Sequence, residues 1–171
     1  MANIRFKFDR KKAIEAILYL ANKVTESVDI YGICKLLYFA DKVSLEQYGC
    51  FIFGETYSAM EQGATPSHAY NLLKHANEIP LDGIRISNND VIALRKANID
   101  CLSESDTECL DKIIEIYGNA PVQRWTDAHD NAWKINWEKR GTKGSKQIPV
   151  EDIAELFNDS DVLIDYLTNV G

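Results

Sequence analysis

Apolar residues recur at intervals of three and four positions in two stretches near the N-terminus, and an aspartate precedes each stretch. This spacing places the apolar side chains on one face of an α-helix, and aspartate is a favoured N-cap residue. The sequence therefore predicts one helix after Asp9 and a second from Asp29 to Gly49, where glycine can adopt the left-handed conformation that ends a helix. We expect these helices to form a hairpin whose inner faces carry Ala13, Ile14, Ile17, Leu18, Ala21, Val24, Ile33, Leu36, Leu37, Ala40 and Val43.

Two short hairpins are predicted from runs of apolar and β-branched residues. Residues 50–53 and 56–60 flank a Gly-Glu pair, and residues 84–86 and 91–94 flank a polar turn. Runs of this kind, separated by turn residues, favour antiparallel strand pairs. The strands are few and short, so the sheet content is minor.

Helix-start signals follow each of these hairpins. Thr65 places a capping hydroxyl before Pro66, which suits the first position of a helix. Ser103 and Asp106 resemble a capping box for another helix, which should end before Gly118. Further short helices are expected over 121–139, 150–157 and 160–169.

The length and composition favour one domain over residues 1–171. A chain of 171 residues, 46% of them hydrophobic, buries about 70% of the surface that it exposes when unfolded. A Gly, Lys and Ser-rich stretch at 140–146 predicts an exposed flexible loop, so that residues 141–171 form C-terminal helices after a loop. The predicted fold class is mainly α (α+β), a compact helical domain with one or two small antiparallel β-hairpins.

The net charge of −7 is unevenly distributed along the chain. Residues 1–28 carry +3, residues 29–133 carry −8, residues 134–146 carry +4 and residues 147–171 carry −6. A general nucleic-acid binder needs clustered Lys and Arg in excess to displace phosphate counterions. Nucleic acid is therefore an unfavoured partner, and the basic 134–146 stretch is the one candidate surface for it.

The cysteines and the N-terminal residues favour a cytoplasmic protein. The four cysteines form no CxxC pair and are too scattered for a disulfide framework. Residues 1–10 lack the apolar segment of a signal peptide, and no apolar run reaches the ~18 residues of a membrane span. We therefore expect a soluble protein without a membrane partner.

No motif specifies a catalytic, metal or cofactor site. His68 and His75 are seven positions apart, whereas a helix usually presents zinc-binding histidines four apart. His129 stands between Asp127 and Asp130, where an acid-oriented imidazole could act as the general base of a small hydrolase. Capping or packing by this histidine is the favoured interpretation, so we expect no metal, no cofactor and no enzymatic activity.

Asp41 lies within an apolar helical segment, and two placements are open for it. A charged residue in such a helix usually faces solvent. However, Leu37 and Leu45 each lie four positions away, so the carboxylate can also border the apolar stripe and accept a hydrogen bond. Tyr38, three positions earlier, would lie beside it. Tyr38 and Asp41 are therefore a candidate polar pair at the edge of a cleft.

Several motifs in order along the chain resemble those of one family. They are KLLYFADK at 35–42 with Gly49 and residues 54–59, the segment 63–73 leading into a helix, residues 102–106 with 117–118, and residues 126–133 with His129 and Trp133. Together they resemble the Panacea domain of SocA-type antitoxins, also found in phage-associated proteins, over residues 9–140. Ala64 and Thr65 stand where the family usually has Pro and Val.

This resemblance implies a bacterial antitoxin that binds and neutralises a cognate protein toxin encoded beside it. It also implies, for some members, an adaptor role that delivers the toxin to a cytoplasmic protease. A neutralising interface needs at least ~1,000 Å² and a few aromatic or Arg anchors. The family motifs place Tyr38, Asp41, His129 and Trp133 as candidate partner-binding residues, and further candidate anchors are Tyr31, Tyr57, Tyr70, Trp125 and Trp137.

The acidic segment 29–133 contains most of these motifs. We expect it to steer toward a basic surface of the toxin, because complementary charge raises the rate of association. If the acidity serves only solubility, added salt should leave that rate unchanged.

Overall fold

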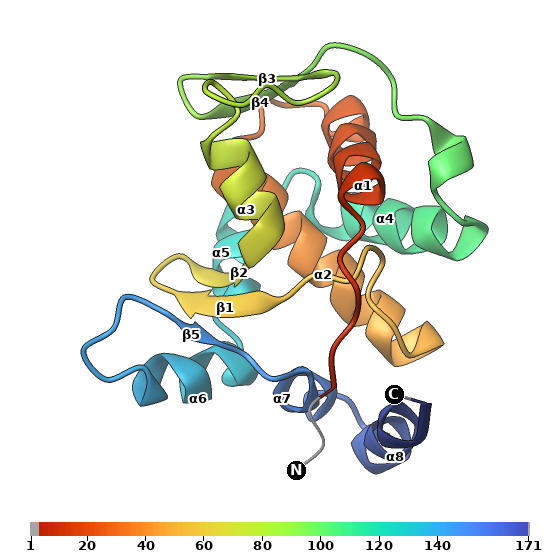
Figure 1. Ribbon diagram of the computed structural model, residues 1–171, viewed down its shortest axis with the longest axis vertical. Helices are drawn as coiled ribbons and strands as arrows, with labels where there is room; N and C mark the ends of the chain where they lie inside the picture. Colours follow the sequence, from red (N-terminus) through yellow and green to blue (C-terminus); the bar gives the residue numbers. More distant parts are fainter. Residues whose placement is uncertain (1–3, 171) are drawn as a thin grey trace.

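Helix α2 (Ile30–Tyr48) runs through the middle of the protein, and the other elements pack around it (Figure 1). The structure, a computed structural model, describes residues 4–170. Side chains all around α2 are buried, among them Ile33, Leu37 and Leu45, as expected of a helix enclosed by a core. The helices that contact it are α1 (Arg10–Lys23), α3 (Ser67–Lys74), α4 (Glu104–Tyr117), α5 (Pro121–Ala128) and α7 (Val150–Ala154).

The caps predicted for the first two helices are confirmed. The Asp9 carboxylate accepts a hydrogen bond from the Lys12 amide (3.0 Å), and the Asp29 carboxylate accepts one from the Gly32 amide (2.7 Å). Gly49 has a φ of 72° and ends α2. These signals act within one helical turn, so the local sequence alone specifies them.

The first predicted hairpin is wrong in position. The antiparallel pair is β1 (Tyr57–Met60) with β2 (Gly63–Pro66), and β5 (Lys146–Gln147) pairs with the other edge of β1. Residues 50–53 form no strand, because their backbone groups bond elsewhere: the Ile52 amide donates to Asp41 Oδ1 (2.7 Å), and the Phe53 carbonyl accepts from the Asp9 amide (2.8 Å).

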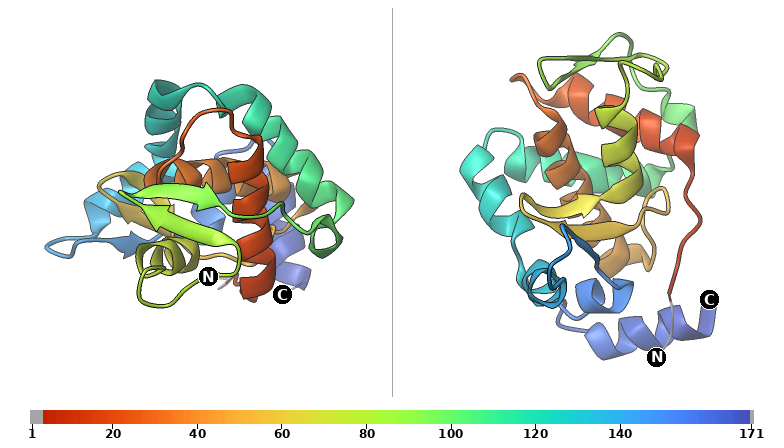
Figure 2. Two further views of the ribbon diagram at one scale, coloured as in Figure 1. Left: turned by 90° about the horizontal axis from the view of Figure 1, so that it is seen from above. Right: turned by 60° about the vertical axis from the view of Figure 1, so that its left-hand side comes forward.

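The second predicted hairpin is confirmed as β3 (Ile84–Ser87) with β4 (Asp90–Ala93). Asn88 and Asn89 form its turn with positive φ angles of 49° and 71°, which suits a tight hairpin turn. Strand β4 contacts α1, and Figure 2 shows the β3–β4 hairpin lying beside α1 in the view from above.

The predicted cap of α3 is wrong. Thr65 belongs to β2, and its hydroxyl donates to the carbonyl of Gly63 (3.0 Å). The helix is instead capped by Glu55, whose buried carboxylate accepts from the amides of His68 (3.0 Å) and Ala69 (2.8 Å). A carboxylate here satisfies free amides and complements the helix dipole.

The second half of the chain is helical, as predicted. Ser103 and Asp106 form the expected capping box at the start of α4. The elements that follow β4 are the 3₁₀-helix η1 (Ile99–Cys101), then α4, α5, α6 (Asn131–Lys139), β5, α7 and α8 (Ser160–Val170). With sheets of two and three strands, the fold is mainly α with minor β structure, as the sequence predicts.

The predicted loop at 140–146 is shorter than expected. Residues 141–145 are exposed, but Lys146 lies in β5, and its ammonium donates to Asn136 Oδ1 (2.6 Å). Helix α7 ends at Ala154, before the predicted residue 157.

Within residues 4–170, every helix is too short or too polar to cross a membrane.

Candidate functional site

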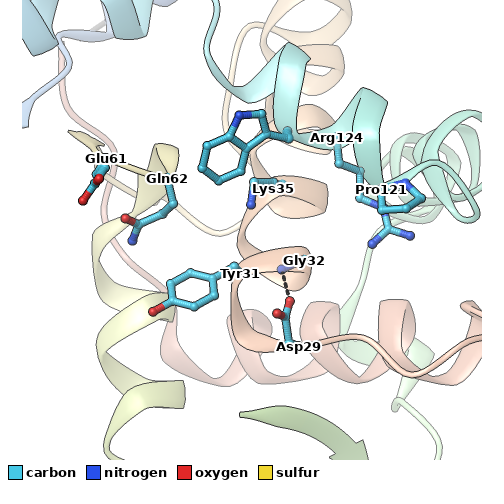
Figure 3. Close-up of a pocket in the computed structure, with 9 residues that line it drawn as sticks. Asp29, Tyr31, Gly32, Lys35, Glu61, Gln62, Pro121 and Arg124 are labelled. Atoms are coloured by element: carbon cyan, nitrogen blue, oxygen red, sulfur yellow. Dashed lines mark hydrogen bonds between the residues drawn. The ribbon is translucent and has the colours of Figure 1, made fainter.

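A pocket opens where the start of α2, the β1–β2 turn and α5 meet (Figure 3). Its volume is about 470 Å³, which lies within the usual range for small-ligand sites. Figure 3 shows Lys35 in the middle of the labelled side chains, with Glu61 and Gln62 on one side and Arg124 on the other. The lining residues are Asp29, Tyr31, Gly32, Lys35, Glu61, Gln62, Pro121, Arg124 and Trp125.

Most of the Lys35 side chain is buried at this site, and its ammonium reaches the pocket without a polar partner. The residue is 8% exposed, and its ammonium lies 5.9 Å from the centre of the Tyr31 ring and 4.9 Å from that of Trp125. Burial lowers the pKa of Lys35, and the nearby charge of Asp29 only partly opposes this effect. Among the residues described, no side chain or carbonyl forms a hydrogen bond or ion pair with this ammonium.

Arg124 forms the opposite wall and also holds two helices together. Its Nε donates to the carbonyl of Tyr117 and its Nη2 to that of Gly118, both at 2.8 Å. These bonds satisfy carbonyls at the end of α4. Its Nη1 lies 3.3 Å from the position that a Cβ on Gly32 would occupy, so a glycine at this position lets α5 approach α2 closely.

A row of contacting rings leads away from the pocket along α5 and α6. It consists of Trp125, His129, Trp133 and Trp137, and we call it the aromatic row. Successive ring centroids lie 4.5, 4.5 and 5.5 Å apart, within the range of favourable ring contacts. A cation closes each end, with Lys35 over Trp125 and the Arg140 guanidinium 3.3 Å from the centre of the Trp137 ring.

Tyr38 and Asp41 lie in the interior beneath this face. Asp41 is 1% exposed and accepts hydrogen bonds from the Tyr57 hydroxyl (2.6 Å) and the Ile52 amide (2.7 Å). Of the two placements left open for Asp41, the structure selects the buried one. Tyr38 does not bond to Asp41; its hydroxyl donates to Asp130 (2.6 Å), while its ring packs on that of Tyr57.

Burial raises the pKa of Asp41 to about 7, and the two hydrogen bonds that it accepts only partly oppose this increase. Burial also raises the pKa of Tyr38, and the neighbouring Asp130 carboxylate adds to the effect. The core therefore contains two hydrogen-bonded pairs, Tyr57 with Asp41 and Tyr38 with Asp130, and the packed rings of Tyr38 and Tyr57 place the pairs side by side. Asp130 connects Tyr38 to the start of α6, because its carboxylate also accepts a hydrogen bond from the Trp133 amide (3.1 Å) and caps that helix.

His129 and Trp133 do lie together, on the aromatic row. The His129 Nδ1 lies 2.7 Å from the carbonyl oxygen of Trp125, and its Nε2 lies 2.9 Å from that of Glu61. The Trp133 indole donates to the carbonyl of Met60 (2.6 Å), so the row is tied to the β1–β2 hairpin. Binding of a partner by Tyr38, Asp41, His129 and Trp133 stays a prediction, with only the last two placed at the surface.

The geometry does not match the His–Asp arrangement considered for a hydrolase. A general base needs a ring nitrogen directed at its substrate, whereas both nitrogens of His129 face backbone carbonyls. Asp127 accepts from Tyr117 and Gln123, and Asp130 accepts from Tyr38, Lys42 and the Trp133 amide. Neither carboxylate orients the imidazole.

The other candidate groups are also engaged locally. His68 contacts Glu55 (2.7 Å) and stacks on Phe8, and His75 contacts Glu78 (3.0 Å). Over residues 4–170, no group of three or more His, Cys, Asp or Glu side chains is arranged to hold a metal ion. Cys34 and Cys109 are buried in the core, as expected for cysteines on the inner faces of helices.

Sequence reasoning missed the two cations of the pocket, Lys35 and Arg124. One signal was available, because Tyr31 and Lys35 are four positions apart and must share a face of α2. Nothing in the sequence placed Arg124 beside them, since this contact depends on the close approach of α5 to Gly32.

Residues 33–134 match a family model described as "Antitoxin SocA-like, Panacea domain". The match covers more than half of the chain and contains all of the motifs quoted above, together with Lys35, Arg124 and Trp125. No curated protein and no solved structure matches the chain.

Proposed function

Because the chain belongs to the SocA-like antitoxin family with the Panacea domain, we propose that it binds a cognate protein toxin and neutralises it by direct contact. The toxin is the product of a neighbouring gene. The face that carries the pocket and the aromatic row contacts it, and Tyr38 and Asp41 position that face from beneath.

The composition of this face supports the proposal. The few residues that carry most of the binding energy in protein–protein interfaces are enriched in Trp, Tyr and Arg. Trp125 is 51% exposed and Tyr31 is partly exposed, so large ring surfaces are available to a partner. Trp125 belongs to both the pocket and the aromatic row, which makes the two features one continuous surface.

The arrangement is also rigid before any partner arrives. His129 and Trp133 are bonded to the backbone of the β1–β2 hairpin, and Arg124 is bonded to the end of α4. Side chains held in this way lose little rotamer freedom on binding, which favours affinity.

The test is co-expression with the product of the neighbouring gene, with growth and complex formation as readouts. The wild-type protein should restore growth and co-purify with the toxin. Trp125→Ala should weaken the complex by about 30-fold or more, as expected for a central aromatic anchor. Ile116→Ala is the matched control, because Ile116 is 52% exposed but lies on α4 away from the pocket; it should bind normally. A toxin that stays fully active beside the wild-type protein contradicts the proposal.

The toxin level separates direct neutralisation from delivery to a protease. On our proposal, the toxin accumulates in an inactive complex. If the toxin instead disappears when the antitoxin is present and is restored by deletion of a cytoplasmic protease, the protein acts as an adaptor and direct neutralisation is wrong.

The acidic segment 29–133 supports a basic partner surface. Its net charge of −8 would attract such a surface and raise the association rate at low salt. Between low and physiological salt, the association rate should therefore fall markedly while the dissociation rate changes little. An unchanged association rate would mean that the acidity serves only solubility.

A further inference from the structure

One buried polar residue differs from all the others. Among residues 4–170, nine polar or charged residues are buried, and eight of them form hydrogen bonds or ion pairs within the chain. Lys35 is the exception. The eight paired residues are Glu15, Asp41, Ser44, Glu55, Thr65, Asp106, Arg124 and Asn136.

This exception needs a physical explanation. Lysine is almost never fully buried unless it is paired. Among the described residues no fully buried side-chain nitrogen or oxygen lacks a hydrogen-bond partner, so most of the Lys35 side chain is buried while its unpaired ammonium keeps contact with solvent at the pocket. Its partial desolvation still carries a cost. The rings of Tyr31 and Trp125 offset part of this cost through cation–π contacts. They satisfy none of the three N–H donors, which face a cavity of about 470 Å³.

We propose that this pocket is the receptor for one carboxylate side chain of the toxin, an Asp or Glu that inserts between Tyr31 and Trp125 and accepts hydrogen bonds from Lys35. The proposal rests on the function proposed above and names the chemistry of the partner at this site. A bond between ammonium and carboxylate is charge-assisted and stronger in a site that excludes water.

The other charges of the pocket favour a singly charged ligand. Arg124 adds positive potential, since its charge lowers the pKa of Lys35. Asp29 and Glu61 also line the pocket and would repel a ligand of higher negative charge. The two cations and two carboxylates sum to zero, so one carboxylate is attracted by its contact with Lys35 and not by a net positive charge of the pocket, and a phosphate group is disfavoured.

Such a pocket would give the interface selectivity. The surrounding segment 29–133 carries −8 and attracts a basic surface, while Lys35 accepts an acidic side chain at one point. A basic protein without an acidic residue at that position would leave Lys35 desolvated and unpaired, which penalises the wrong partner.

The first test uses the isolated full-length protein and needs no toxin. N-acetyl-glutamate N-methylamide and its glutamine counterpart are titrated separately, and binding is followed by NMR at the Trp125 indole, assigned through Trp125→Phe. The glutamate compound should bind weakly, with a Kd of about 10 mM, and the glutamine compound at least ~10-fold more weakly because it lacks the charge. Equal shifts from the two compounds, or no shift from either, overturn the proposal. AMP, which carries a phosphate group, is titrated in the same way. If AMP binds more tightly than the glutamate compound, the proposal is also overturned.

The second test uses the complex with the toxin. Lys35→Met retains most of the side-chain volume and removes the charge, and should weaken the complex by about 100-fold, the loss expected when one partner of a buried charge pair is removed. Lys23→Met is the matched control, because Lys23 also lies over an aromatic ring, that of Tyr19 (4.8 Å), away from the pocket. It should change affinity by less than about 3-fold.

Two outcomes distinguish this inference from the proposed function. If the wild-type protein binds no toxin, the proposed function is wrong, and the NMR titration still decides whether the pocket binds carboxylates. Thermal melting first shows that Lys35→Met and Lys35→Gln are folded. If both variants then bind the toxin as tightly as the wild type does, the carboxylate pocket is wrong and the antitoxin role stands.

Discussion

Helix α2 contains two largely buried ionisable residues, Lys35 and Asp41, whose contacts differ. Asp41 accepts two hydrogen bonds, from the Tyr57 hydroxyl and the Ile52 amide. Lys35, six residues earlier, has ring contacts only. A buried polar group that is satisfied within the chain holds elements in place, whereas one left unsatisfied beside a cavity is available to a ligand. The comparison therefore separates a structural polar site from a binding site on the same helix.

The most severe change to the structural site is Asp41→Ala. It leaves the Tyr57 hydroxyl and the Ile52 amide buried without an acceptor, and each unsatisfied donor costs about 1–3 kcal/mol. We expect the free energy of unfolding to fall by about 4 kcal/mol, measured by urea denaturation at pH 5.

Asp41→Asn is the control for this prediction. Its amide oxygen can accept from Ile52 and its amide nitrogen can donate to Tyr57, so the loss should stay within about 1 kcal/mol. Equal losses for the two variants would show that the hydrogen bonds of Asp41 do not hold α2 to the segment that follows it.

The second prediction concerns pH. Burial raises the pKa of Asp41 to about 7, whereas an unfolded aspartate titrates near ~3.9. Between these values the folded state binds one proton more than the unfolded state, so stability falls as pH rises and levels off above pH ~7. The loss through Asp41 should be about 4 kcal/mol in all.

Urea denaturation at several values of pH between about 4 and 8 measures this loss. Asp41→Asn cannot titrate and should give a flatter profile, and the difference between the two profiles isolates Asp41 from the other titrating groups. Parallel profiles would mean that burial does not raise the pKa of Asp41 above its value in the unfolded chain.

Local signals in the sequence predicted much of the fold for a physical reason. The caps Asp9, Asp29 and Ser103 act within one turn of the helices that they begin, so neighbouring residues specify them. The cap of α3 could not be found in this way, because Glu55 reaches that helix from the far side of the β1–β2 hairpin. Strand β5 was missed because it has only two residues and pairs with β1, far away in the sequence.

The candidate site was only partly predictable for the same reason. His129 and Trp133 both belong to the closing motif of the family resemblance, which named them together; in the structure His129 ends α5 and Trp133 lies in the first turn of α6. The pairing of Tyr38 with Asp41 was wrong, because tertiary contacts supply Asp130 to one and Tyr57 to the other. Lys35 stands within an apolar run, and only the packing of α5 against α2 shows that its side chain is largely buried and that its ammonium has no partner.

The third prediction concerns the hydrogen bond between Tyr38 in the core and Asp130 at the start of α6. Tyr38→Phe removes the hydrogen bond from the core to Asp130, and should lower the free energy of unfolding by about 1 kcal/mol, measured by urea denaturation. Lys42 and the Trp133 amide still bond to Asp130, which limits the loss. Tyr19→Phe is the matched control: its partner Asp111 is exposed, so water replaces the lost donor and stability should hardly change. If Tyr38→Phe and Tyr19→Phe lowered the free energy of unfolding equally, the hydrogen bond from Tyr38 to Asp130 would contribute no more to stability than an exposed one.

The smallest expected effect has the opposite sign and bears most directly on the comparison. Lys35→Met replaces the ammonium of a largely buried side chain with an apolar group of similar length, in contact with the same two rings. Because the Lys35 ammonium forms no hydrogen bond or ion pair within the described chain, the substitution removes a partial desolvation cost and loses only the cation–π contacts with the two rings. We expect the free energy of unfolding to rise by about 0.5–1 kcal/mol at pH 7, measured by urea denaturation beside Lys23→Met, which should leave it nearly unchanged. A variant that is more stable than wild type yet binds the toxin less well would identify Lys35 as a residue kept for binding at the expense of stability. A clear loss of stability would instead place Lys35 with Asp41, among the groups that hold the fold together.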